Sequence, residues 1–241
     1  MEVLERLTGK CQHDFAVHEI ESDNVVFKNF MCKKCKYSFV KKIQKENISF
    51  PELEHFKKYL NKPYQKTLLN EDIINSSLNA IKEYAKGGKI RGLIFHDKRG
   101  TGKTHLAIKL MKIFKAKLKK SIYALNFSSF VLDRVREINL AKSGLYNQYN
   151  PPATFDIENE ALETDVLLLD EVGKGNNTTY VNALLYTFVN NAYMNEDKFL
   201  IITTNLSPSQ FEEGIDDAVV SRLYEICEFV SFNHLEDYRR I

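Results

Sequence analysis

Residues 91–105 read Arg-Gly-Leu-Ile-Phe-His-Asp-Lys-Arg-Gly-Thr-Gly-Lys-Thr-His, and this stretch decides the fold. The apolar run Leu93–Phe95 predicts a short buried strand, and the apolar spacing that begins at Leu106 predicts a helix. A turn with two glycines, ending in Gly102-Lys103-Thr104, joins the two elements. In such a strand–turn–helix unit, backbone N–H groups and the helix N-terminus surround phosphate groups. The stretch therefore predicts a phosphate-binding loop.

The residues of this loop have separate expected roles. Lys103 is expected to reach the β- and γ-phosphates of a nucleotide, and the Thr104 hydroxyl is expected to hold Mg²⁺. The first glycine of the pattern Gly-x-x-x-x-Gly-Lys-[Ser/Thr] is replaced by Asp97. We expect this residue to place a carboxylate near the polyphosphate and to reduce nucleotide affinity. The nucleotide-binding residues expected from the motif are Gly100, Thr101, Gly102, Lys103, Thr104 and His105.

The bulk composition is that of an ordinary soluble globular protein. The 241 residues are 44% hydrophobic and 27% charged, and they can form one large domain or a small domain beside a medium one. The net charge of +2 argues neither for nor against nucleic acid. The chain has no apolar run long enough to cross a membrane and no signal-peptide pattern at its start. We therefore expect a cytoplasmic location and no membrane partner.

The first 45 residues carry three of the four cysteines. Cys32 and Cys35 form a Cys-x-x-Cys pair, and Cys11 with His13 supplies a second short-spaced pair. Paired Cys and His ligands beside strand-like segments suit tetrahedral Zn²⁺, whose binding contributes folding free energy to a block with little core. We expect a zinc-ribbon-like module with Cys11, His13, Cys32 and Cys35 as ligands, with His18 as the alternative to His13. Reduced, unpaired cysteines in a loop-rich arm are the competing interpretation.

From residue 89 onward, segments typical of strands and helices alternate. Apolar strands are expected over 122–126, 165–170 and 199–204, and a long helix is expected over 178–194. Alternation of this kind predicts an α/β fold, with a parallel sheet flanked by crossover helices.

Polar residues stand where the later strands of this sheet end. Asp170 ends an apolar strand, which is where a P-loop fold places a carboxylate near the Mg²⁺ coordination shell. Glu171, the next residue, is expected to polarise the attacking water. Asn205 follows the next strand, either beside that water or as a helix N-cap. Arg222 is either donated to a neighbouring subunit's γ-phosphate or paired with Glu225 at i+3.

In this order, the motifs resemble the AAA+ ATPases. More narrowly, residues 70–241 resemble the DnaC/DnaI-type replicative helicase loaders and the related IstB-type transposition ATPases. The pieces that carry the resemblance are Gly100–Ala107, Leu167–Gly173, Ile201–Leu206 and Ser221–Glu225. The resemblance implies a P-loop AAA+ domain in which Lys103 and Thr104 belong to Walker A, Asp170 and Glu171 to Walker B, Asn205 to sensor 1, Arg222 to the arginine finger and Arg239 to a sensor-2-like position.

The resemblance also implies a function and its partners. The chain is expected to be an ATPase that binds ATP/ADP with Mg²⁺, self-associates through AAA+ interfaces and loads a hexameric replicative helicase in a bacterium or a phage-infected host. The expected domains are a helicase-binding zinc module over 1–45, a linker over 46–70 and the AAA+ ATPase domain over 71–241. Single-stranded DNA is the second expected partner, and its candidate contacts are Phe127, Phe130, Arg134 and Arg136.

Several alternatives stay open. An IstB-type transposition helper keeps the ATPase and exchanges the helicase for a transposase and duplex DNA. A non-hydrolysing replication adaptor, favoured by Asp97, uses its nucleotide site only as an interaction surface. Phe127 and Phe130 are spaced i, i+3, which fits a buried helix face as well as a stacking surface. In many relatives an arginine precedes the tyrosine at the end of the helix after Asp170-Glu171, whereas in this chain Ala192 precedes Tyr193.

Overall fold

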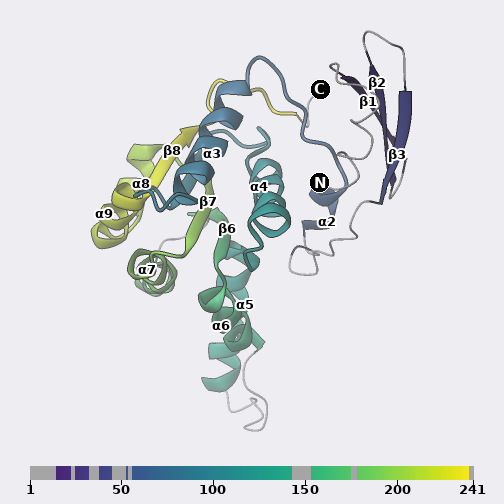
Figure 1. Ribbon diagram of the computed structural model, residues 1–241. Coiled ribbons are helices and arrows are strands. Elements are labelled where there is room, and N and C mark those ends of the chain that lie inside the picture. Colours follow the sequence, from purple (N-terminus) through teal and green to yellow (C-terminus); the bar gives the residue numbers. More distant parts are fainter. Residues whose placement is uncertain are drawn as a thin grey trace. The chain divides into compact units, whose positions relative to one another are not determined.

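The computed structural model describes residues 15–22, 25–32, 38–44, 53, 56–142, 153–174 and 178–238 (Figure 1). The chain divides into two compact units, Met1–Ser49 and Phe50–Ile241. None of the helices in these ranges is long and apolar enough to cross a membrane.

The first unit contains a three-stranded antiparallel sheet in the order β1-β2-β3. Its strands are β1 (Phe15–Ser22), β2 (Val25–Cys32) and β3 (Ser38–Gln44). The register pairs Phe15 with Cys32 and Ser22 with Val25, so β1 and β2 form a hairpin along their full length. Valine and phenylalanine, which favour strands, occur in all three segments.

The second unit is built on a five-stranded sheet in the order β5-β6-β7-β4-β8, with every pair parallel. This arrangement confirms the predicted α/β fold. The strand β4, which precedes the glycine turn, lies between β7 and β8. The end of β7, which Asn205 follows, is therefore next to that turn. The strands are β4 (Gly92–His96), β5 (Ile122–Asn126), β6 (Val166–Val172), β7 (Phe199–Thr204) and β8 (Cys227–Ser231).

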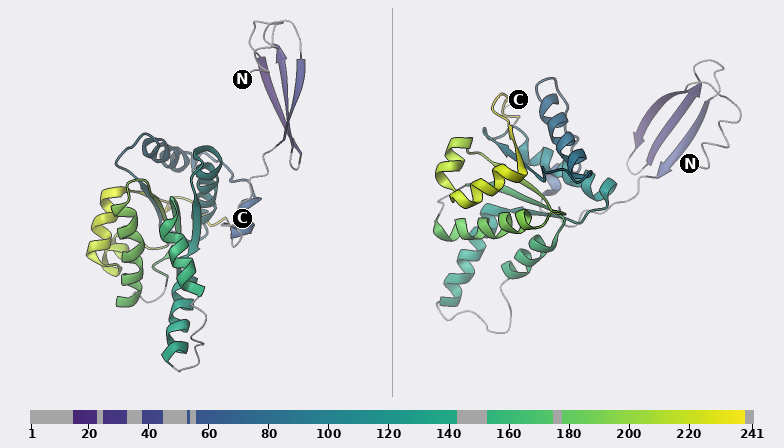
Figure 2. Two further views of the ribbon diagram at one scale, coloured as in Figure 1. Left: turned by 60° about the horizontal axis from the view of Figure 1, so that its bottom comes forward. Right: turned by 60° about the vertical axis from the view of Figure 1, so that its left-hand side comes forward.

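Helices cover both faces of this sheet, and the two layers can be followed in Figures 1 and 2. Side chains alternate along a strand, so Leu93 and Phe95 of β4 pack on one face while Ile94 packs on the other. The first face is covered by α3 (Glu71–Tyr84) and α4 (Lys103–Leu118). The second face is covered by α5 (Phe127–Lys142), α6 (Ala153–Glu163), α7 (Thr179–Met194), α8 (Pro208–Gly214) and α9 (Asp217–Ile226).

The short helix α2 (Lys57–Leu60) and the residues before it belong to this second unit. Leu53 and Phe56 are buried in the core on the α3/α4 face. The ammonium groups of Lys109 and Lys112 donate to the carbonyl of Leu60 at 3.2 and 3.3 Å, which ties α2 to α4. The segment 46–70 was expected to be a linker, but its described part packs on the sheet domain.

Candidate nucleotide-binding site

The glycine turn between β4 and α4 has the backbone that its sequence predicts. Gly100 and Gly102 both have positive φ, at 79° and 90°, and Gly102 is the N-cap of α4. Glycine adopts this left-handed conformation without the steric cost that a Cβ imposes. Asp237 also occupies the space beside Gly100, because a Cβ there would lie 1.9 Å from the Asp237 Oδ1 atom. A side chain at position 100 would therefore clash with Asp237, and the turn leads directly into the first N–H groups of α4.

Asp97 lies in the same turn with φ 77°, although it is not a glycine. Its carboxylate accepts a hydrogen bond from Ser231 Oγ of β8 at 2.7 Å and lies 2.8 Å from His96 Nδ1. We expected this carboxylate near the polyphosphate. In the structure, the hydrogen bond from Ser231 holds the side chain at β8.

Lys103 is almost completely buried at the first position of α4. Its ammonium donates to the carbonyl of Asp97 at 2.7 Å and to the carbonyl of Lys98. These contacts place the positive charge inside the curve of the turn, where a phosphate would meet both the ammonium and the helix N-terminus.

Asp170 of β6 lies next to Thr104, as the two motifs predict. Its Oδ1 atom accepts hydrogen bonds from Thr104 Oγ1 and Thr203 Oγ1, both at 2.7 Å. Burial raises the pKa of Asp170, and the two hydroxyl donors only partly oppose this. A carboxylate beside a hydroxyl is an oxygen donor set that suits Mg²⁺.

Glu171 stands at the end of the same strand with φ 61°. Its Oε2 atom accepts a hydrogen bond from Lys174 Nζ at 2.8 Å and one from Asn126 Nδ2 at 3.4 Å. Partial burial raises the pKa of Glu171, but the hydrogen bonds from Lys174 and Asn126 and the Lys174 charge outweigh it, so the pKa lies below its ordinary value. Glu171 is therefore held as a carboxylate.

Neither Asn126 nor Lys174 is predicted as a site residue from the motifs. Asn126 ends β5 and pairs in register with Asp170, so a polar residue at the end of the neighbouring strand was the signal that could have found it. Lys174 has no such signal, because it lies in an irregular segment and only its contact with Glu171 identifies it.

Lys103, Thr104 and Lys174 line a cleft of about 850 Å³. Thr203, Asn205 and Glu171 line it at the strand ends, and His105 lines it from α4. The His105 ring nitrogen Nε2 lies 3.0 Å from the carbonyl oxygen of Lys62. Among the described lining residues, Glu171 is the single carboxylate, so the cleft favours an anion. Its cations are Lys58, Lys62, Arg99, Lys103 and Lys174.

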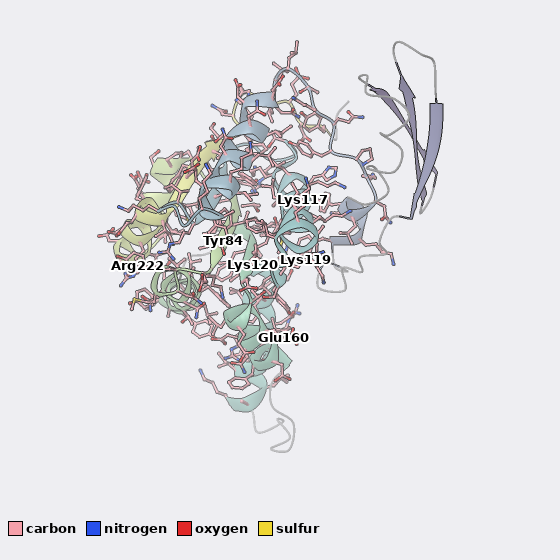
Figure 3. The ribbon with its side chains drawn as sticks, viewed as in Figure 1. Tyr84, Lys117, Lys119, Lys120, Glu160 and Arg222 are labelled. Carbon is pink, nitrogen blue, oxygen red and sulfur yellow. The ribbon has the colours of Figure 1, made fainter. Side chains whose placement is uncertain are left out.

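Arg222 is not among the described residues that line this cleft; it lies on α9, where Figure 3 labels it. Its guanidinium donates to the carbonyl of Ala218 at 2.7 Å and to the Tyr186 hydroxyl at 3.2 Å, over the Tyr186 ring. Glu225 accepts a hydrogen bond from the Tyr193 hydroxyl at 2.9 Å. In the described part of the chain, Arg222 therefore makes tyrosine contacts, and the ion pair with Glu225 is not among them.

The candidate DNA contacts on α5 are corrected in part. Phe127 and Phe130 are buried and place their ring centroids 6.4 and 5.9 Å from that of Phe188 on α7. They are core residues and present no stacking surface. Arg134 pairs with Glu158 at 2.9 Å, and Arg136 pairs with Asp133 at 2.9 Å.

Several predicted site residues lie outside the described residues: Cys11, His13, Cys35 and Arg239. Cys32 is the last residue of β2. Within the ranges that the structure describes, no group of three or more His, Cys, Asp or Glu side chains gathers around a common point. The zinc site therefore stays a prediction.

The model of the bacterial DnaA ATPase domain matches residues 57–226. The chain belongs to this family. The matched range contains the glycine turn, Asp170-Glu171, Asn205 and Arg222, so the family assignment identifies the second unit as a nucleotide-binding ATPase domain of the DnaA type. The family assignment and the fold confirm the resemblance to the AAA+ ATPases.

Solved structures of DnaA-type and loader proteins share this fold. The DnaC helicase loader is 23% identical, with a TM-score of 0.57 over 73% of this chain and 98% of that chain. DnaI is 16% identical, with a TM-score of 0.56 over 73% and 93%. DnaA from Aquifex aeolicus bound to AMPPCP is 19% identical, with a TM-score of 0.51 over 69% of this chain and 48%, about half, of that DnaA chain. No curated protein sequence matches the chain.

Proposed function

We propose that the protein is an ATP-dependent loader of a hexameric replicative helicase. The observation that carries the proposed ATPase activity is the 2.7 Å hydrogen bond from Thr104 to Asp170, because Thr104 and Lys103 both line the cationic cleft. The proposed role in helicase loading is supported by the likeness in fold to the DnaC helicase loader, because the match covers 98% of that loader's chain.

In the proposed reaction, Lys103 exchanges the carbonyls of Asp97 and Lys98 for the β- and γ-phosphates of ATP. Thr104 and Asp170 would hold Mg²⁺, which when bound neutralises charge on the phosphate oxygens. The Glu171 carboxylate, kept ionised by its lowered pKa, orients the attacking water and accepts its proton, and Asn205 lies at the same end of the cleft. Arg239 is proposed to contact the same nucleotide as the sensor-2-like residue.

Arg222 is proposed to act on the nucleotide of a neighbouring subunit. It does not line the cleft of its own chain, and it sits on α9 with tyrosines for neighbours. Self-association that delivers this arginine would add positive charge to the γ-phosphate, which accelerates hydrolysis about 10³–10⁵-fold in related chemistry.

The first unit is proposed to bind the helicase, with Zn²⁺ held by Cys11, His13, Cys32 and Cys35. The family match begins at residue 57, so this unit is additional to the ATPase domain. Single-stranded DNA is proposed as a ligand of the ATPase domain, in the cytoplasm of a bacterium or a phage-infected cell. An IstB-type transposition helper is the alternative, and a non-hydrolysing replication adaptor is the second.

The enzymatic half is tested by ATP hydrolysis, measured with and without single-stranded DNA. Lys103→Ala is expected to lose ATP binding, because the charge inside the turn is gone. Glu171→Gln is expected to bind ATP and to hydrolyse it roughly 10²–10⁴-fold more slowly. Glu213→Gln, on the exposed side of α8, is the matched control and should hydrolyse at the wild-type rate. Unchanged turnover in both site variants would overturn the enzymatic proposal, and failure of the wild type to bind ATP at micromolar concentrations would favour the adaptor.

The partner half is tested by capture of the purified replicative helicase. The wild type is expected to bind it, and Cys32→Ser is expected to lose this binding while keeping ATP binding. Capture of a transposase with duplex DNA in place of the helicase would favour the IstB-type function.

A further inference from the structure

Tyr64 lies against the glycine turn from the segment between α2 and α3. The position that a Cβ would take on Gly102 is 3.4 Å from Tyr64 Cε2 and 3.6 Å from Tyr64 Oη. Gly102 is the N-cap of α4, so the hydroxyl stands beside the first N–H groups of that helix. Tyr64 also lines the cationic cleft.

The Tyr64 hydroxyl is buried and has no hydrogen-bond partner among the residues that the structure describes. Buried polar groups are almost always hydrogen-bonded, and a group without a partner in a cleft is one that a ligand can satisfy. Burial, together with the nearby Tyr238, raises the pKa of Tyr64 above its ordinary value. The group is therefore a neutral hydroxyl with a proton to donate.

The ring that carries this hydroxyl is fixed from the side. His105 packs edge-on against it with ring centroids 5.1 Å apart, and His105 is itself tied to the carbonyl of Lys62. A donor held by packing loses little rotamer entropy when it forms a hydrogen bond.

The surroundings decide what kind of atom this donor meets. The helix N-terminus at Gly102 supplies N–H donors, and the cleft supplies lysine and arginine cations. A ligand atom among them must be an acceptor, and a negatively charged oxygen gains most from this arrangement.

We propose that the Tyr64 hydroxyl donates a hydrogen bond to a phosphate oxygen of the bound nucleotide. The proposal rests on the function proposed above for the cleft and adds to it a binding residue from outside the glycine turn. It accounts for a buried hydroxyl that has no hydrogen-bond partner within the described ranges of the chain.

The experiment compares Tyr64→Phe with Tyr84→Phe. Each substitution removes one tyrosine hydroxyl and keeps the ring. The Tyr84 hydroxyl donates to the carbonyl of Asp197, and Tyr84 does not line the nucleotide cleft, which makes it the matched control. For each protein, the dissociation constants of Mg-ATP and Mg-tripolyphosphate are measured by calorimetry, and the melting temperature is measured without ligand.

The two variants are expected to show opposite patterns. Tyr64→Phe should weaken both ligands by about tenfold, as expected for a hydrogen bond to a charged group, and should not lower the melting temperature. Tyr84→Phe should lower the melting temperature, because it breaks a hydrogen bond inside the protein, and should bind both ligands as the wild type does.

Four results would overturn the proposal. Equal ATP affinity in Tyr64→Phe and the wild type would show that the hydroxyl is not a ligand contact, while the function proposed for the cleft would stand. A loss confined to ATP, with tripolyphosphate unaffected, would place the contact on the nucleoside. A lower melting temperature in Tyr64→Phe would show that the hydroxyl already has a partner in the protein. A wild type that binds neither ligand would overturn the function proposed for the cleft as well.

Discussion

Asp97 shows how one side chain can satisfy two demands. The turn needs a left-handed backbone at this position, and Asp is among the few non-glycine residues that adopt it readily. The carboxylate then bonds to Ser231, which joins the glycine turn to β8. The residue is therefore a structural anchor of the turn.

Substitution of Asp97 separates these two contributions. Asp97→Ala should lower the free energy of unfolding by about 1–2 kcal/mol, because it loses the Ser231 hydrogen bond and keeps a backbone that disfavours alanine. Asp97→Gly should lose less, because glycine adopts the positive φ freely. ATP affinity should be the same in Asp97→Gly and the wild type. Urea unfolding and ATP titration measure the two quantities, and tighter ATP binding by Asp97→Gly would show that the carboxylate does act on the phosphates.

At the scale of elements, a buried lysine connects α6 to the sheet. Lys198 precedes β7, is fully buried, and donates to the carbonyls of Ala161 and Leu162 at 2.9 and 2.7 Å. These carbonyls lie in the last turn of α6, where the helix itself offers no partner. Burial lowers the pKa of Lys198 to about 8, although the charge of Asp165 opposes this.

The lowered pKa of Lys198 predicts a dependence of stability on pH. Below about pH 8 the lysine is protonated in both states, so it adds no slope. Between about pH 8 and pH 10 the folded protein releases the proton while the unfolded chain keeps it, so the free energy of unfolding rises with pH. Urea unfolding at about pH 7.5 and about pH 9.5 should show a larger increase for the wild type than for Lys198→Met. Equal increases in the two proteins would show that Lys198 is not the group that titrates.

At the scale of the whole molecule, the two units are expected to draw their stability from different sources. The second unit buries two apolar layers on the faces of a parallel sheet. The first unit is a three-stranded sheet within about 50 residues, and a single core of that size contributes little stability, so natural domains this small often add a metal or disulfides.

Removal of Zn²⁺ is therefore expected to act on the first unit alone. A strong chelator should abolish helicase binding and remove one calorimetric transition, while ATP affinity and the transition of the second unit stay as they were. Cys32→Ser should have the same effect without chelator. Cys227→Ser is the matched control, because Cys227 is buried in the second unit, and it should keep the full zinc content. Protein purified without zinc that still binds the helicase would contradict this prediction.

Much of the fold and part of the candidate site follow from the sequence alone. The apolar runs that became β4, β6 and β7 are short, continuous and separated by helix-length segments, which is the local pattern of a buried parallel sheet. Parallel strands end at one edge of the sheet. Asp170 near the end of β6 and Asn205 just after β7 are therefore brought to the glycine turn by topology.

The tertiary structure decided what depends on contacts between distant segments. Tyr64, Asn126 and Lys174 carry no motif, and only packing places them at the cleft. The spacing of Phe127 and Phe130 fits a buried helix face and an exposed stacking surface equally well. Their ring contacts with Phe188 of α7 show that they belong to the core. The direction of the Asp97 carboxylate depends on Ser231, which lies on the next strand of the sheet. Local periodicity and turn residues determine which elements form and which backbone conformation a turn needs. The contact partner of each side chain is determined only by the tertiary packing of distant segments.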